Sequence, residues 1–109
     1  MAQIVWTERA WKQYRSCLKY SHDEFGAKAA KRFFENVSKR TRRLERFPLT
    51  GFIEPMLSDR SEGFRGSIIQ KNFRLIYHYV RYDDIVFIDD IWDTRREPKK
   101  LKARIYNSK

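Results

Sequence analysis

The sequence predicts an α+β fold, with an antiparallel sheet of about four strands, two N-terminal helices packed on one sheet face, and a short C-terminal helix. The first half of the chain contains two segments whose apolar residues recur every three or four positions, which is the period of an amphipathic helix. Residues 64–92 contain three segments of alternating apolar and polar residues, separated by short turns. We expect the 109 residues to form one domain (1–109), because this length supports a single hydrophobic core.

The N-terminal elements are a short strand at residues 3–6 and a first helix. Thr7 is a suitable N-cap for this helix. The spacing of apolar residues predicts that the helix ends near Tyr20 and that Ser21 or Asp23 caps the next one, which places His22 between the two helices. The predicted inner face consists of Ala10, Trp11, Tyr14, Cys17 and Leu18.

The second helix is longer and ends before Pro48, since proline cannot continue a helix. Its predicted inner face consists of Ala30, Phe33, Phe34, Val37, Thr41 and Leu44. Its outer face is basic and consists of Lys28, Lys31, Arg32, Lys39, Arg42, Arg43 and Arg46. This face suits phosphate, with Arg42 and Arg43 as candidate RNA-binding residues. A solvated surface and a docking site for an acidic partner are the alternatives.

Residues 48–63 are rich in proline, glycine and other turn formers, which predicts a loop with a short extended piece at residues 52–53. Strands are then expected at residues 64–70, 73–82 and 85–92. Lys71-Asn72 and Asp83-Asp84 are the predicted turns between them. Pro98 suits the first turn of the C-terminal helix.

The strand register decides which polar side chains meet. If both turns are two-residue loops, Arg65 lies opposite His78, His78 opposite Asp89, and Arg74 opposite Asp93. One sheet face then carries Arg65, Ser67, Arg74, Ile76 and His78. The other face, which the helices cover, carries Phe64, Ile68, Phe73, Leu75, Tyr77, Tyr79, Ile88 and Trp92.

The predicted polar face has two interpretations. Arginines would bind phosphate through bidentate contacts and stabilise developing charge, with His78 as the group that transfers a proton. The alternative is an open sheet face that carries only cross-strand ion pairs. The sequence alone leaves both open.

Composition and motifs exclude several classes of function. The chain has 24 Lys and Arg against 14 Asp and Glu, a formal charge of +10, which favours a polyanionic partner. With one cysteine and two histidines, we expect no disulfide, no metal site and no cofactor. Neither a glycine-rich phosphate loop nor a G-x-S-x-G motif occurs. Without a signal peptide or a long apolar run, we expect a cytoplasmic protein and no membrane partner.

Three segments, FPLTG, FRGSIIQKNFRLIYHY and IVFIDDIWDTRREPKKL, together resemble toxins of the RelE/ParE superfamily. These proteins are the toxin halves of bacterial type II toxin–antitoxin modules. The resemblance implies a RelE/ParE-like fold related to microbial ribonucleases. It also implies growth inhibition, and a small, partly acidic antitoxin as the cognate partner. The short strand N-F-R-L-I-Y and the ending D-T-R-R-x-P are its most specific parts.

RelE-type members are endoribonucleases that enter the ribosomal A site and cut mRNA, using basic side chains that align the 2′-hydroxyl for attack on the adjacent phosphate. Here Arg74 matches the arginine of the core strand, and Arg65 the basic residue of the preceding strand. Arg95 or Arg96 matches the arginine after the last strand. The resemblance therefore makes Arg65, Arg74 and Arg95 candidate catalytic residues together with His78. Candidate RNA-binding residues are Lys71, Arg96, Arg42 and Arg43.

The chain departs from the RelE pattern in two ways. Ser67 replaces a lysine of the preceding strand, and no histidine–tyrosine pair follows the last strand, so the general base is not identified. ParE-type members share the fold but inhibit DNA gyrase through protein contacts, which Pro48 and Gly51 after the long helix suit. We favour ribosome-dependent mRNA cleavage. The alternatives are gyrase inhibition and an inactive member that only binds its antitoxin.

Overall fold

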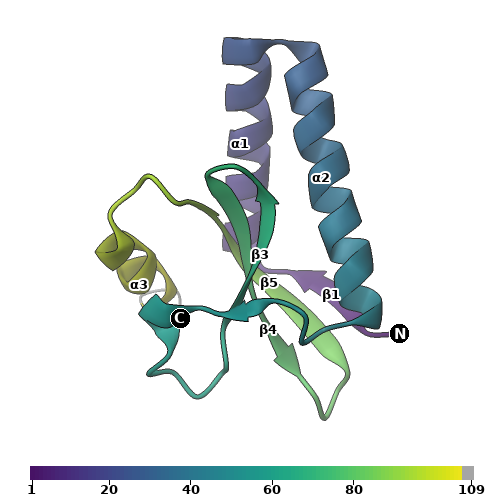
Figure 1. Cartoon of the computed structure of the whole chain (residues 1–109), viewed down its shortest axis with the longest axis vertical. Coiled ribbons are helices and arrows are strands. Elements are labelled where there is room, and N and C mark those ends of the chain that lie inside the picture. Colours follow the sequence, from purple (N-terminus) through teal and green to yellow (C-terminus); the bar gives the residue numbers. More distant parts are fainter. Residues whose placement is uncertain (107–109) are drawn as a thin grey trace.

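The computed structural model describes residues 1–106, which form three α-helices, one short 3-10 helix and a five-stranded sheet (Figure 1). In chain order the elements are β1 (Gln3–Trp6), α1 (Glu8–Phe25), α2 (Ala27–Arg46), β2 (Phe52–Ile53), η1 (Pro55–Leu57), β3 (Arg65–Gln70), β4 (Phe73–Val80), β5 (Ile85–Asp93) and α3 (Pro98–Tyr106). This is the predicted α+β fold. The fifth strand is β2, the short extended piece expected in the loop.

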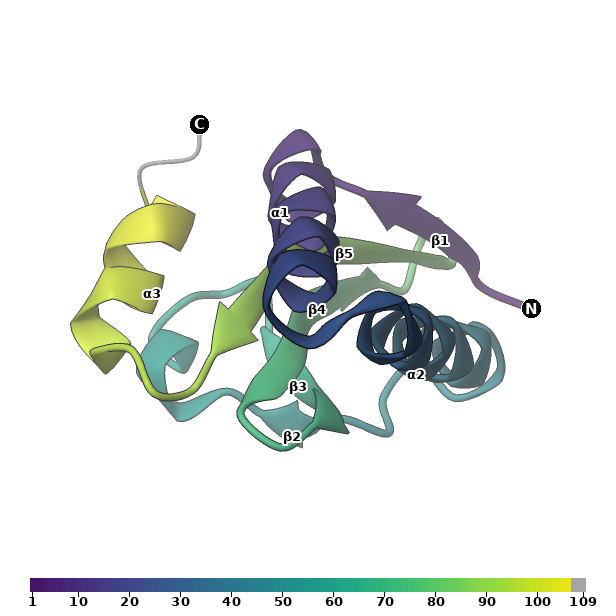
Figure 2. The ribbon, with the colours of Figure 1, turned by 90° about the horizontal axis from the view of Figure 1, so that it is seen from above.

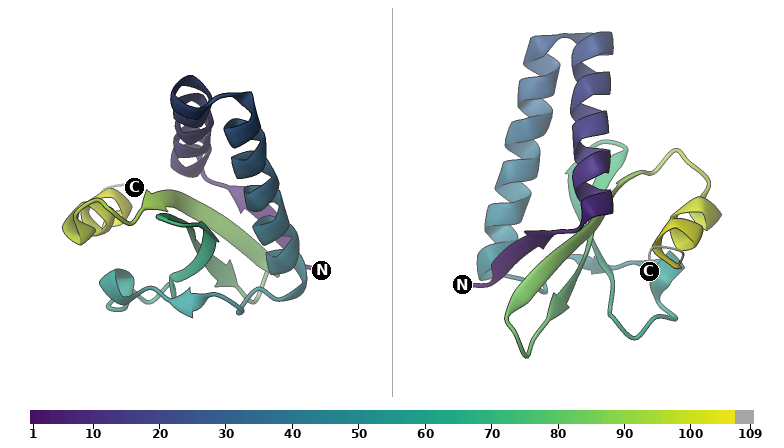
Figure 3. Two further views of the ribbon diagram at one scale, coloured as in Figure 1. Left: turned by 45° about the horizontal axis from the view of Figure 1, so that its top comes forward. Right: turned by 180° about the vertical axis from the view of Figure 1, so that it is seen from behind.

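The sheet has the strand order β1-β5-β4-β3-β2. Three neighbouring pairs are antiparallel, and β1 runs parallel to β5. A parallel neighbour needs a long crossover connection, and here α1, α2 and the rest of the sheet lie between the two strands in the chain. Helices α1 and α2 lie over one face of the sheet, with η1 and α3 on the opposite side (Figures 2 and 3).

Helix α1 starts as predicted and ends later than predicted. The Thr7 hydroxyl accepts a hydrogen bond from the backbone N–H of Ala10 at 3.2 Å, which caps the helix. The helix passes Tyr20 and ends at Phe25, because the first residue that stops it is Gly26 with φ of +93°. The last turns of α1 therefore contain three residues expected in a connection: Ser21, His22 and Asp23.

The main core lies between the sheet and the α1–α2 pair, and we call this side of the sheet the α1/α2 face. Its fully or largely buried members include Ala10, Tyr14, Phe33, Val37, Leu44, Leu75, Tyr77 and Ile88. Two aromatic residues predicted for the inner helix faces are not in it, since Trp11 is 47% exposed and Phe34 is 52% exposed. Each follows a buried residue in the helix, and adjacent residues do not face the same side.

A second, smaller core lies on the opposite face of the sheet, which we call the α3 face. It consists of Leu57, Phe64, Ile76, Trp92, Leu101 and Ile105. Phe64 and Trp92 were expected on the α1/α2 face, and both lie here instead. Ile68 was expected to be covered and is 57% exposed. These corrections have one cause, the strand register.

Two β-bulges change the register. The Lys71-Asn72 turn forms as predicted and pairs Gln70 with Phe73, but an irregularity between Ile68 and Gln70 then shifts the pairing by one residue. As a result Arg65 lies opposite Tyr77 rather than His78. Because Tyr77 belongs to the main core, Arg65 and its alternate neighbour Ser67 lie on the α1/α2 face.

The second hairpin has a four-residue turn at residues 81–84, not a two-residue turn, and pairs Val80 with Ile85. A bulge follows on β5 opposite the step from Ile76 to Tyr77. Arg74 is thus paired with Trp92 and not with Asp93, and His78 with Phe87 and not with Asp89. The prediction that Arg65 and Arg74 share one polar surface is therefore wrong, because the two arginines lie on opposite faces of the sheet.

The bulge places Asp90 in the interior beneath α3. Its carboxylate accepts hydrogen bonds from the backbone N–H of Ile91 at 2.8 Å and from the guanidinium of Arg104 on α3. The Asp90 side chain is fully buried. Burial raises the pKa of Asp90 to about 6, and the charge of Arg104 offsets only part of that effect.

This raised pKa predicts a pH-dependent loss of stability. Because Asp90 holds its proton more tightly in the folded state, the unfolded chain binds fewer protons as pH rises from about 4 to 6, and the free energy of unfolding falls by roughly 3 kcal/mol. Asp90→Asn is expected to lack this fall. Urea unfolding of both proteins across this range measures the difference, and parallel pH profiles would contradict the prediction.

Candidate functional site

Arg74, near the start of the central strand β4, forms a two-point ion pair with Glu54. Arg74 Nη2 donates to Glu54 Oε1 at 3.0 Å, and Arg74 Nε lies 3.0 Å from Glu54 Oε2. The Glu54 side chain is fully buried and that of Arg74 is 22% exposed. The guanidinium carbon of Arg74 lies 5.4 Å from the centre of the Phe52 ring, which covers its other side.

The position of Glu54 is set by the chain around it. Glu54 follows β2, its backbone N–H donates to the Phe64 carbonyl at 3.0 Å, and Pro55 starts η1 directly after it. The carboxylate is thereby carried across to the α3 face, where Arg74 projects from β4. No pattern in the sequence distinguishes Glu54 from the other loop glutamate, Glu62. A signal existed in Arg74 itself, because a charged side chain inside an apolar strand requires a buried partner.

The ion pair lies in the wall of a cavity of about 340 Å³ on the α3 face. The cavity is bounded by residues of the β2–η1 segment, the end of β5 and the start of α3: Phe52, Glu54, Pro55, Met56, Arg74, Trp92, Thr94, Pro98 and Leu101. An arginine in such a wall can bind a phosphate oxygen through two parallel hydrogen bonds. A carboxylate beside it can accept a proton. A group that can bind phosphate and a group that can accept a proton are thus adjacent.

A second polar group on the α3 face joins His78 of β4 to Asp89 of β5. His78 Nδ1 and Asp89 Oδ2 are 2.6 Å apart, so the predicted contact forms even though the two residues are not directly opposite. The His78 ring stacks on Phe87 with centroids 5.2 Å apart and meets Phe64 edge-on. Burial raises the pKa of Asp89, and its hydrogen bond to His78 opposes that rise.

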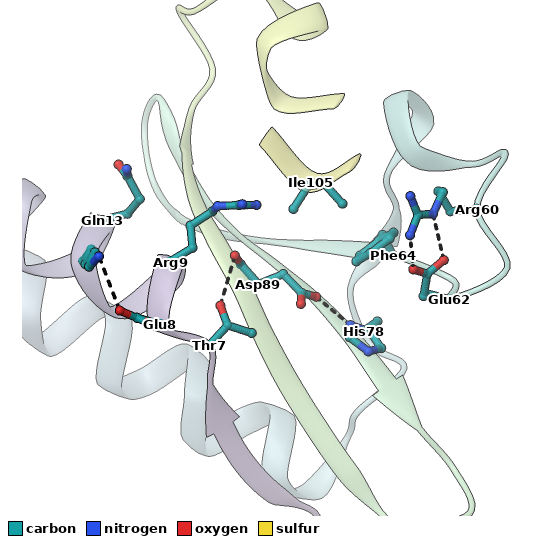
Figure 4. A pocket seen from close by; sticks show the side chains of 11 residues that line it. Thr7, Glu8, Arg9, Gln13, Arg60, Glu62, Phe64, His78, Asp89 and Ile105 are labelled. Carbon is teal, nitrogen blue, oxygen red and sulfur yellow. Dashed lines mark hydrogen bonds and ion pairs between the residues drawn. The ribbon is translucent and has the colours of Figure 1, made fainter. Parts of the chain in front are cut away.

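His78 and Asp89 line a cavity of about 720 Å³ between the start of α1, the loop before β3 and α3. Figure 4 shows the side chains that line it. Arg9 reaches toward Ile105 from α1, and Arg60 faces Glu62 on the far side. Three cations and three carboxylates contribute to the lining, namely Arg9, Lys12, Arg60, Glu8, Glu62 and Asp89. The cavity is therefore polar and close to neutral.

Arg65 is held by backbone oxygens of the loop between α2 and β2. Its Nη1 donates to the Gly51 carbonyl at 2.8 Å and to the Leu49 carbonyl at 3.3 Å. The Gly51 N–H in turn donates to the Tyr77 hydroxyl at 2.9 Å. These contacts fix the loop between α2 and β2. These hydrogen bonds hold the Arg65 side chain on the α1/α2 face, away from Arg74.

Arg95 and its neighbours lie beyond the end of β5. Arg95 Nε and Nη2 donate to the two carboxylate oxygens of Asp93 at 2.9 and 2.8 Å, and the Arg95 guanidinium lies over the Phe73 ring. Since Phe73 packs against the main core, Arg95 lies toward the α1/α2 face. Arg96 is exposed. Lys71 is exposed in the β3–β4 turn and lines the same cavity as Arg95.

The two arginines predicted to bind RNA from α2 are both exposed, Arg42 and Arg43. The Arg43 guanidinium lies 5.6 Å from the centre of the Phe47 ring, beside a cavity that Arg46 and Arg81 also line. This surface is basic and lies outside the wall that contains Arg74.

Comparison with known proteins identifies the family. The family model for the ParE toxin of the type II toxin–antitoxin system parDE matches residues 4–98. The chain belongs to this family. It is thus a toxin of a type II toxin–antitoxin system. No sequence among the curated proteins matches this toxin.

Solved structures share the fold of the toxin. A chain of the chromosomal ParDE system from P. aeruginosa has a TM-score of 0.67 at 15% identity, over 85% of the toxin and 96% of that chain. The isolated E. coli RelE toxin has a TM-score of 0.59 at 15% identity, over 94% of the toxin and 95% of RelE. The YoeB–YefM toxin–antitoxin complex from Staphylococcus aureus has a TM-score of 0.54 at 18% identity, over 84% of the toxin and 95% of the matched chain.

The four predicted catalytic side chains of the toxin do not converge. Arg74 and His78 share the α3 face, but they are four positions apart along β4, a distance of about 13 Å. Arg65 and Arg95 lie toward the α1/α2 face. Within residues 1–106 no three His, Cys, Asp or Glu side chains are grouped to hold a metal ion, and no helix is long and apolar enough to cross a membrane.

Proposed function

We propose that this toxin inhibits growth by cutting mRNA on the ribosome, as RelE-type members do, and that Arg74 and Glu54 form its reaction centre. The observation that carries the proposal is the two-point ion pair between a strand arginine and a fully buried carboxylate in a cavity wall. Arg74 is one of the three arginines that the resemblance to RelE-type toxins singled out, with Arg65 and Arg95. Glu54 supplies the general base that the sequence pattern lacked.

The chemistry assigned to the pair is transfer of an RNA phosphate to the neighbouring 2′-oxygen. Arg74 binds the non-bridging oxygens of the phosphate and stabilises the charge that builds on them. Glu54 takes the proton of the 2′-hydroxyl as that oxygen bonds to phosphorus. The bond from phosphorus to the 5′-oxygen breaks, and the leaving oxygen takes a proton from water. The products are a 2′,3′-cyclic phosphate and a 5′-hydroxyl.

In the free toxin the Glu54 carboxylate is paired with the Arg74 guanidinium. A phosphate that enters the cavity competes with Glu54 for the same guanidinium N–H groups, and its binding releases the carboxylate to accept a proton. The exchange begins at the part of the Arg74 side chain that is exposed to solvent, 22% of it. The closed pair is therefore a resting state whose opening depends on substrate.

Inhibition of DNA gyrase by protein contacts is the second candidate. The separation of Arg65, Arg74 and Arg95 favours it, because these side chains cannot share one phosphate in this conformation. The match to a ParE family model also favours it. In this case the Glu54–Arg74 pair is a structural element that fixes the β2–η1 segment to β4.

For either target we propose a small, partly acidic antitoxin as the cognate partner and the cytoplasm as the place of action. The formal charge of +10 suits an acidic segment of such a partner. The YoeB–YefM complex is a toxin–antitoxin assembly built on this fold.

The two candidates differ in what induction of the toxin does to a cell. RNA cleavage predicts discrete new transcript ends by primer extension, at codons that ribosomes occupy, with plasmid supercoiling unchanged. Intact transcripts together with blocked supercoiling would replace this proposal by gyrase inhibition.

A further inference from the structure

A separate cavity of about 480 Å³ lies between the α1–α2 pair and the β3–β4 turn. Figure 1 shows that this turn lies beside the two helices, whose far ends extend well beyond the sheet. Residues from the last turns of α1, the first turns of α2 and the turn itself line the cavity. It lies on the α1/α2 face, whereas the proposed reaction centre lies on the α3 face.

All the charged side chains that line this cavity are positive. Its lining includes Lys28, Arg32, Lys71 and Arg95, and it includes no carboxylate. Asp93 neutralises Arg95 from outside the lining. Across residues 1–106 no ion pair involves Lys28, Arg32 or Lys71. Three uncompensated cations thus surround a space that suits a polyanion.

Two exposed aromatic rings border the same space. Tyr20 is 52% exposed and Phe25 is 69% exposed, and their ring centroids lie 6.1 Å apart in an edge-to-face arrangement. Both residues line the cavity. Aromatic rings left in solvent next to cations are the combination found where proteins bind single-stranded nucleic acid, with bases on the rings and phosphates on the cations.

We propose that this cavity is a binding subsite for single-stranded RNA, with a base against Phe25 and flanking phosphates on Lys28, Arg32 and Lys71. An acidic amphipathic helix is a poorer fit, because a docked helix requires an extended groove for a row of apolar side chains. A volume near 480 Å³ instead matches a site for one small group. The inference rests on the proposed function, since it names a further contact for the RNA that the toxin cuts.

The test measures binding separately from cleavage. The purified full chain is titrated into a fluorescein-labelled 2′-O-methyl hexauridylate, which cannot undergo 2′-oxygen attack, and anisotropy is followed at several salt concentrations. Phe25→Ala is expected to weaken binding by about fivefold or more, the cost of losing one stacked base. Lys28→Ala and Lys71→Ala are each expected to reduce the slope of log affinity against log salt by about 0.7, the contribution of one phosphate contact.

Lys100→Ala is the control, because Lys100 is exposed on α3 and does not line the cavity. It should leave the affinity and the slope within experimental error of the unaltered chain. Equal affinity of Phe25→Ala and the unaltered chain, or equal losses in Lys100→Ala and Lys28→Ala, would overturn the subsite. So would binding of a deca-glutamate peptide that depends on Lys28 and Phe25 in the absence of RNA binding, which would assign the cavity to an acidic protein.

The two proposals fail in different ways. Cavity-dependent binding of the hexauridylate by a toxin that leaves transcripts intact supports the subsite and refutes only the cleavage. Cleavage that persists when Phe25→Ala binds RNA as well as the unaltered chain refutes only the subsite.

Discussion

Glu54→Gln is expected to lower the rate of mRNA cleavage by about 100- to 10,000-fold, the usual contribution of a positioned general base. The amide has nearly the same shape as the carboxylate, and its oxygen still accepts a hydrogen bond from Arg74. It cannot take the proton of the 2′-hydroxyl. Single-turnover cleavage of mRNA on purified ribosomal complexes measures the rate directly.

Glu62→Gln is the control for this prediction. Glu62 is also a loop carboxylate paired with an arginine, Arg60, but it lines the His78 cavity rather than the Arg74 cavity. Its substitution should change the cleavage rate less than twofold. If Glu62→Gln and Glu54→Gln lose activity equally, the base lies elsewhere, and the His78–Asp89 pair becomes the leading candidate.

Arg74→Met is expected to lower the free energy of unfolding by about 3–5 kcal/mol, because it leaves the Glu54 carboxylate buried without a partner. Replacing both members of a buried pair by apolar residues is often neutral or stabilising. The double variant Arg74→Met with Glu54→Leu should therefore recover most of the lost stability. Urea unfolding of the three proteins gives the comparison.

The double variant also separates stability from function. It should be well folded and nevertheless unable to cut mRNA, since both reacting groups are gone. A double variant that stays as unstable as Arg74→Met would show that the pair is not the source of the loss. A stable double variant that still arrests growth by cutting mRNA would remove both residues from the mechanism.

Local signals in the sequence were sufficient to predict the elements of the fold. The Thr7 cap, the stop before Pro48 and the helix that begins at Pro98 were all confirmed, since each depends on a few adjacent residues. The register was not predictable in this way. A β-bulge inserts one extra residue into a strand, and no particular residue type marks its position in the sequence. Because side chains alternate along a strand, a one-residue shift in register moves all of its side chains to the other face of the sheet.

The candidate site shows the same division. Arg74 was identified within its strand. The contact of His78 with Asp89 was confirmed because the four-residue turn shifts the pairing by two residues, and an even shift leaves both side chains on one face. Glu54 was not singled out, because it lies 20 residues from Arg74 in the chain. Their contact depends on how the segment through η1 and β3 folds between them. Only the folded chain brings that carboxylate under β4.

The most direct measurement uses an mRNA with a single 2′-deoxynucleotide at the position that the toxin cuts on the ribosome. Attack by the 2′-oxygen predicts that this message stays intact at that site, while the all-ribose message yields a 2′,3′-cyclic phosphate and a 5′-hydroxyl. Cleavage of both messages at the same rate, or of neither, would contradict an RNA-cutting centre built on Arg74 and Glu54.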